Sequence, residues 1–110
     1  MSNGSKMKPV EILLIEDNQG DIRLTFEALN ECKIINNLNV IYDGVEAMAY
    51  LRNGGQFRDK PRPELILLDL DLPRKDGREV LAEIKQENSL NRIIFFKKKI
   101  FTKKEYKKKK

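Results

Sequence analysis

The stretch LILLDLDLP, Leu65 to Pro73, decides how this chain folds. It holds an uninterrupted apolar run of strand length that ends in Asp69, and Gly77 follows within a few residues. Such a run is typical of a parallel strand that is buried on both faces of its sheet. Because open α/β sheets place ligand sites at the carboxyl ends of their strands, the sequence predicts that Asp69 lies at such a site.

A second apolar strand, predicted from Val10 to Ile15, ends in the acids Glu16 and Asp17. Two neighbouring parallel strands would bring three carboxylates to one place, which indicates a cation site or a carboxylate that a cation makes reactive. An ordinary alternative stays open, because acids that follow strands often cap the next helix. Asp17 or Asn18 could do only this for the helix expected near Asp21.

The composition limits the chemistry that the chain can perform. It has no histidine and one cysteine, which excludes Ser-His-Asp and Cys-His catalysis and the usual zinc cages. Oxygen ligands remain, and these favour magnesium, manganese or calcium. The single Cys32 suits a cytoplasmic protein and is expected to pack on the buried side of a helix. No apolar stretch approaches the ~18 residues of a membrane span, so we expect no membrane partner.

The net charge of +5 is unevenly distributed along the 110 residues. Residues 97–110 hold nine lysines and one acid, a local charge of +8, so the first 96 residues carry −3. Because the basic charge belongs to this tail, nucleic acid is not an expected partner. We interpret residues 1–7 as a disordered leader and residues 97–110 as a lysine-rich tail that is disordered or read out of frame. A genuine basic extension for anionic partners is the alternative.

Helical and strand patterns alternate along the chain. Apolar spacing predicts a helix from about Asp21 to Cys32, a second after Asp43-Gly44 and a third after Gly77. Further strands are predicted from Leu38 to Tyr42 and from Arg92 to Phe96. The order βαβαβαβ predicts an α/β fold with right-handed crossovers and a doubly wound parallel sheet.

Three segments together resemble a known family: VEILLIEDN (residues 10–18), DGVEAMAYLR (residues 43–52) and LILLDLDLPRKDG (residues 65–77). They resemble the response-regulator receiver domains of two-component signalling. Over residues 8–96 the chain is similar, more narrowly, to small single-domain regulators paired with phytochrome-type sensor kinases. The resemblance implies a flavodoxin-like (CheY-like) receiver fold, here truncated after the fourth of five strands.

The resemblance also implies a role for each acid. Asp69 would accept a phosphoryl group, Asp17 would bind Mg²⁺ directly, and Glu16 would act through a coordinated water. The backbone carbonyl of Asp71 would complete the protein's share of the metal shell. The expected partner is a sensor histidine kinase or a phosphotransfer protein. The chain would be a signalling module rather than an enzyme, with at most weak autophosphatase activity.

The chain departs from this family at its C-terminal end. A receiver has a fifth strand and two more helices, with a Ser or Thr ending strand four and a Lys ending strand five. The Ser or Thr position falls near Lys98 or Lys99, and the Lys of strand five has no counterpart, so we expect poor phosphorylation. Loss of strand five also predicts an open sheet edge at residues 92–96, where the side chains of Ile93, Ile94, Phe95 and Phe96 lose their cover. A degenerate receiver that only binds partners is therefore the main alternative. The spacing Asp69-x-Asp71 also resembles the D-x-D motif of haloacid-dehalogenase-like phosphatases. This alternative is disfavoured, because that family carries the motif on its first strand.

Overall fold

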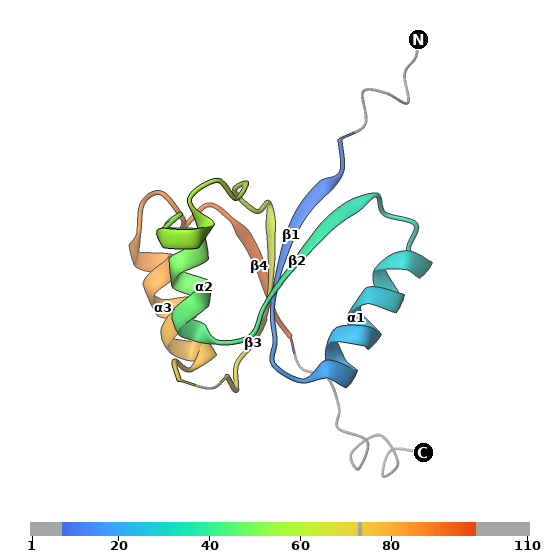
Figure 1. The fold of residues 1–110 in the computed structure, drawn as a ribbon, viewed down its shortest axis with the longest axis horizontal. Helices are drawn as coiled ribbons and strands as arrows, with labels where there is room; N and C mark the ends of the chain where they lie inside the picture. Colours follow the sequence, from blue (N-terminus) through green and yellow to red (C-terminus); the bar gives the residue numbers. More distant parts are fainter. Residues whose placement is uncertain (1–7, 73, 99–110) are drawn as a thin grey trace.

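The computed structural model describes residues 8–72 and 74–98, which form a four-stranded parallel sheet with helices on both faces (Figure 1). The strand order is β2-β1-β3-β4 and every strand pair is parallel, which confirms the doubly wound α/β fold. The strands are β1 (Val10–Ile15), β2 (Asn36–Ile41), β3 (Leu65–Asp69) and β4 (Ile94–Lys98). The helices are α1 (Gln19–Glu31), α2 (Gly44–Leu51), α3 (Gly77–Gln86) and a 3₁₀ turn, η2 (Gly55–Phe57). The predicted leader and residues 99–110 of the predicted tail lie outside the described residues. The first two residues of that tail, Lys97 and Lys98, belong to β4 instead.

Side-chain caps set the points where the helices begin. Asn18 accepts the backbone N–H of Asp21 at 2.9 Å, and α1 accordingly begins before the predicted residue 21. Asp43 caps α2 in the same way, and Asp76 forms a capping box with Glu79 at the start of α3. All three caps follow strands at the carboxyl edge of the sheet, as the helices of a parallel sheet require.

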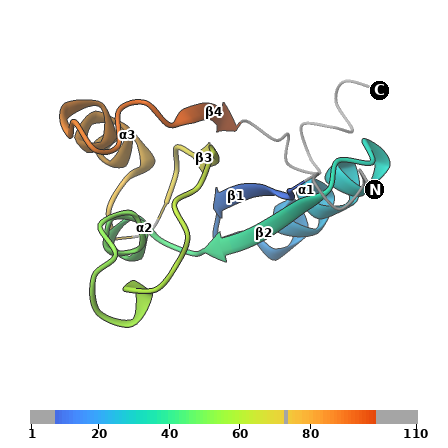
Figure 2. The ribbon, with the colours of Figure 1, turned by 90° about the horizontal axis from the view of Figure 1, so that it is seen from above.

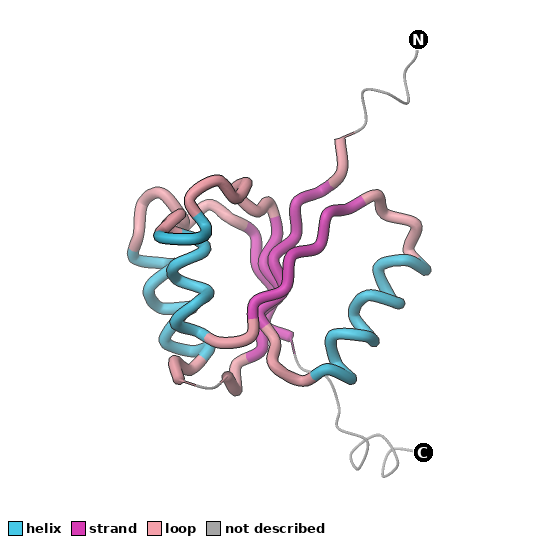
Figure 3. The backbone as a smooth tube through the Cα atoms, viewed as in Figure 1, coloured by secondary structure: helices cyan, strands magenta, loops and turns pink. Residues whose placement is uncertain are grey.

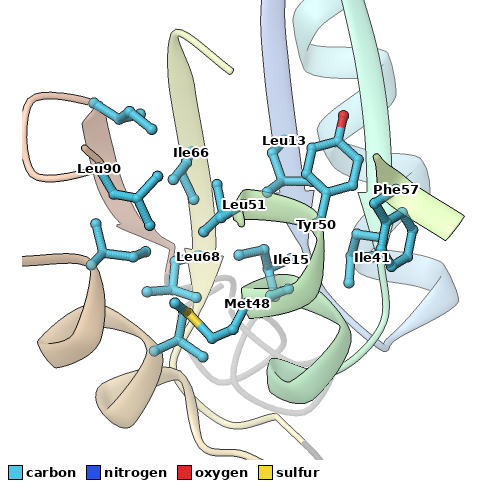
Figure 4. Close-up of a cluster of buried hydrophobic side chains, with 14 residues drawn as sticks. Leu13, Ile15, Ile41, Met48, Tyr50, Leu51, Phe57, Ile66, Leu68 and Leu90 are labelled. Carbon is cyan, nitrogen blue, oxygen red and sulfur yellow. The ribbon is translucent and has the colours of Figure 1, made fainter. Parts of the chain in front are cut away.

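The main core lies between the sheet and the helices α2 and α3 (Figures 3 and 4). Leu13 and Ile15 of β1 contribute to this core, while Ile12 and Leu14 are buried on the opposite face. The central strand β1 is thus buried on both faces, as its continuous apolar run predicts. The core residues are Leu13, Ile15, Ile41, Ala47, Met48, Tyr50, Leu51, Phe57, Ile66, Leu68, Val80, Ile84, Leu90 and Ile93.

The opposite face of the sheet is less covered. Among the described residues, α1 is the helix on this face, and it lies beside β1 and β2 (Figure 2). Cys32 is exposed, so the prediction that it packs inward is wrong. The reason is local: the helix ends at Glu31 and Cys32 is its C-cap. Phe26 is also 53% exposed, although its spacing from Ile22 and Leu29, at i, i+4 and i+7, predicts that it faces inward.

The strand β4 forms one edge of the sheet and begins two residues later than predicted. Ile94 and Phe96 are 63% and 60% exposed. Ile93 is buried, and Phe95 packs against the core with the Lys85 ammonium 5.9 Å from its ring centroid. The expectation that all four residues lose their cover is therefore wrong for Ile93 and Phe95. Alternate strand residues face opposite sides, and the α3 side remains covered.

This edge predicts self-association of the chain. An exposed apolar edge strand templates pairing with other chains. Phe96→Ser should therefore lower static light scattering by roughly threefold or more at equal protein concentration. It should also sharpen the thermal unfolding transition followed by near-UV circular dichroism. Leu24→Ser is the matched control, because Leu24 is 52% exposed but lies on α1. Equal scattering by the wild type and both variants would contradict association through β4.

Candidate functional site

Three acids meet at the carboxyl edge of the sheet. Glu16, Asp17 and Asp69 each offer a carboxylate oxygen, and these oxygens all lie within 4.8 Å of one another. The parallel register explains this meeting, because Ile15 pairs with Leu68 and the acids follow directly on each strand. The structure thus brings together the three side chains that the sequence singled out for a cation site.

The three acids differ in their burial. Glu16 is 1% exposed, accepts the backbone N–H of Asn18 at 3.1 Å and interacts with the Asp69 side chain. Asp69 is half-buried, and Asp17 is exposed. The cluster therefore has a buried wall at Glu16 and opens to solvent at Asp17. The alternative that Asp17 or Asn18 only caps the next helix holds for Asn18, which is the N-cap of α1, and not for Asp17.

The electrostatics of the cluster favour a bound cation. Burial raises the pKa of Asp69 to about 6, and the neighbouring carboxylates of Glu16 and Asp71 act in the same direction. The backbone N–H of Asp71 opposes them, because it donates to Asp69 Oδ1 at 3.0 Å. Ionised carboxylates at this spacing repel one another, and a divalent cation removes that repulsion. The donor set is all oxygen and fits a hard cation.

Asp71 lies in the turn that follows β3. Its N–H contacts Asp69, and its exposed carboxylate is 3.3 Å from Arg78 Nη1. The role of its backbone carbonyl as a metal ligand stays a prediction. This turn supports that role, since it holds the Asp71 backbone beside Asp69.

Gly77 closes the loop between β3 and α3. Its N–H donates to the carbonyl of Leu70 at 3.1 Å, and a Cβ at this position would lie 2.2 Å from the carbonyl oxygen of Asp69. A larger residue would therefore displace the strand end that carries Asp69. The D-G pair at 76–77 signals this close approach in the sequence.

Sequence reasoning missed one ion pair, which involves the loop between β3 and α3. Arg74 Nη2 lies 2.7 Å from Asp43 Oδ2, across 31 residues of chain. Burial raises the pKa of Asp43, but the N–H of Glu46 and the Arg74 guanidinium outweigh it and hold that pKa below its usual value. The Asp43-Gly44 pair indicated a turn, and nothing in the pattern joined it to Arg74.

Comparison with known proteins identifies the family. Residues 12–108 match the model of the response regulator receiver domain. The chain belongs to this family. Response regulator Rcp1 of Synechocystis sp. is 54% identical over 85 residues, which make up 77% of this chain and 58% of that relative. Among the described residues, no helix is long and apolar enough to cross a bilayer.

Two solved structures share the receiver fold. One is the phosphorylated cyanobacterial phytochrome response regulator RcpA, with a TM-score of 0.76 and 52% identity; the match covers 80% of this chain and 63% of that one. The other is the Mn²⁺-bound form of response regulator Rcp1, with a TM-score of 0.76 and 53% identity over 79% of this chain and 63% of that one. This receiver chain therefore spans less than two thirds of these relatives.

The raised pKa of Asp69 predicts a pH-dependent penalty on folding when divalent metal is removed. The folded chain keeps the proton of Asp69 up to about pH 6, whereas the unfolded chain releases it near 3.8, so the folded state binds more protons in this window. The free energy that Asp69 contributes to stability therefore falls as the pH rises through the window. Asp69→Asn should gain stability over the wild type between about pH 4 and pH 7.

Urea unfolding in EDTA across this pH range measures the difference. Asp59→Asn, at an exposed position away from the cluster, should follow the wild type at every pH. A constant difference between Asp69→Asn and the wild type would contradict the raised pKa.

Proposed function

We propose that this chain is a phosphoacceptor module of a two-component relay, which receives a phosphoryl group on Asp69 from a sensor histidine kinase or a phosphotransfer protein. The observation that carries this proposal is the meeting of Glu16, Asp17 and Asp69 at the carboxyl edge of a receiver sheet. The output is contact with another protein, in the cytoplasm. The chain acts as a signalling module rather than as an enzyme.

The metal that fits this role is Mg²⁺. It prefers hard oxygen ligands, keeps several waters and takes few carboxylates. Exposed Asp17 suits direct coordination, buried Glu16 suits contact through a water, and the Asp71 carbonyl completes the set. The Mn²⁺-bound form of Rcp1 supports a divalent cation in a related receiver. A bound Mg²⁺ supplies positive charge that keeps the cluster ionised and offsets charge on the phosphoryl oxygens.

The residues of the chain supply the nucleophile and its orientation. A carboxylate oxygen of Asp69 forms the new bond to phosphorus, while the bond from phosphorus to the donor's histidine nitrogen breaks and its electron pair stays on that nitrogen. The N–H of Asp71 fixes the rotation of the Asp69 carboxylate through the bond to Oδ1. Because Asp69 ends a strand with buried neighbours, its backbone position is fixed before the donor arrives.

The efficiency of transfer is limited by the neighbouring strand. The register pairs Asp69 with Lys98 at the end of β4, close to where the family resemblance expects a Ser or Thr. Within residues 8–72 and 74–98, no Ser or Thr ends β4, and no fifth strand presents a positive group to Asp69. We therefore expect slow phosphorylation.

Metal binding can be tested with Mg²⁺ alone. Titration should shift the amide signals of residues near Asp17 and Asp69, because the cation contacts carboxylates at both strand ends. Asp17→Ala should abolish these shifts, while Glu27→Gln, an exposed acid on α1, should leave them unchanged. Shifts confined to the loop at residues 56–63 would overturn the assignment of the metal site.

Phosphorylation can be tested with acetyl phosphate and Mg²⁺. Intact mass spectrometry should show partial addition of one phosphoryl group to the wild type and none to Asp69→Asn. Asp59→Asn should be labelled like the wild type. Labelling of Asp69→Asn at the wild-type level would overturn the assignment of Asp69. Rapid and complete labelling of the wild type would contradict the expected slow rate.

A further inference from the structure

The ion pair between Asp43 and Arg74 joins the N-terminus of α2 to the loop between β3 and α3. Asp43 uses both carboxylate oxygens: Oδ1 accepts the N–H of Glu46 at 2.8 Å, and Oδ2 contacts Arg74 Nη2 at 2.7 Å. The Asp43 side chain is 12% exposed and that of Arg74 is 56% exposed, so water reaches the contact mainly from the Arg74 side. A pair with one partner this buried holds its geometry better than a fully exposed pair.

The backbone of the loop needs this support. Arg74 has a φ of 63°, in the left-handed region that costs free energy for a residue other than glycine. Its neighbour Lys75 lies against α2, since a Cβ on Gly44 would be 2.0 Å from the Lys75 carbonyl oxygen. Lys75 also forms an ion pair with Glu83 of α3. The tip of the loop is thus fastened to both helices on one side of the sheet.

The same loop carries, at its other end, the turn beside Asp69 of the acid cluster. Asp69 begins it, the Asp71 N–H contacts Asp69, and the bond from Gly77 to Leu70 closes its base. Leu72 packs against the core between the turn and the tip. Arg74 is three residues along the chain from Asp71. Loss of its contact with Asp43 would let the left-handed backbone at Arg74 relax, and this change would shift the Asp71 backbone relative to Asp69.

We propose that Asp43 and Arg74 are positioning residues, which hold the turn at Asp69 and Asp71 in the geometry that binds the divalent cation. Neither residue belongs to the acid cluster. The inference rests on the proposed function, because metal affinity is the quantity that such positioning changes. Groups that orient metal ligands from outside the ligand set are known to affect affinity strongly.

Three substitutions separate the ion pair from the other roles of these residues. Asp43→Asn keeps a side-chain oxygen for the α2 cap, since Asn caps helices as well as Asp, but removes the charge. Arg74→Gln removes the guanidinium. Arg74→Gly removes it too, and it relieves the left-handed backbone, so this variant should fold at least as well as Arg74→Gln.

The experiment measures the dissociation constant of Mg²⁺ by titration, with thermal unfolding of each variant alongside. All three variants should bind Mg²⁺ about threefold to tenfold more weakly than the wild type. The double variant Asp43→Asn/Arg74→Gln should bind no more weakly than either single variant, because the two residues act as one unit. Arg74→Lys, which restores the positive charge, should recover part of the affinity.

The matched control is Glu87→Gln, which removes the charge pair between Glu87 and Arg52, the residues that follow α3 and α2. It leaves in place the Glu83 carboxylate, which pairs with both Arg52 and Lys75 of the loop. It should keep the wild-type affinity for Mg²⁺ even where its unfolding temperature falls. Wild-type affinity in Arg74→Gly and Asp43→Asn would overturn the positioning role, as would an equal loss in Glu87→Gln. If the wild type binds Mg²⁺ no better than Asp17→Ala, the proposed function itself fails, and the two failures are thereby distinguished.

Discussion

The close approach of Glu16 and Asp69 is the constraint on which the rest of the site depends. Glu16 is almost fully buried, and burial together with its charge raises the pKa of Asp69. Two carboxylates in this position oppose folding unless something offsets their charge. The apolar strands β1 and β3 overcome that opposition, since their paired residues are buried in the core and bring the acids together at the edge. The packing of the sheet therefore stabilises a group of carboxylates whose mutual repulsion a cation would offset.

The strand patterns made the sheet and the acid cluster predictable. Continuous apolar runs indicated buried parallel strands, and the acids at their ends had to share one edge once the topology was doubly wound. The positions of Glu16, Asp17 and Asp69 follow from backbone register alone, which hydrophobic pattern determines well. The role of each acid, in contrast, came from the family resemblance.

The features that could not be predicted depend on contacts between distant segments. Cys32 and Phe26 fit a helical stripe, but the helix ends before Cys32, and no described element covers Phe26. The bounds of β4 moved because Ile93 hydrogen bonds back to Leu90 in a turn, which delays the strand. The Asp43–Arg74 pair spans 31 residues, and no local periodicity encodes a partner at that separation.

The two faces of the sheet contribute unequally to the site. The α2 and α3 face is densely packed and holds the loop after β3 through ion pairs from both helices. The α1 face leaves Ile94 and Phe96 of β4 exposed, and β4 pairs with β3 along its whole length, up to Asp69. Asp69 is thus supported firmly from one side and weakly from its neighbour strand. In the proposed site, β1 and the loop after β3 would supply the ligands of the cation, so its binding would depend on the firm side. The proposed phosphoryl transfer would also depend on groups at the end of β4. If both proposals hold, this architecture would bind a cation more readily than it accepts a phosphoryl group.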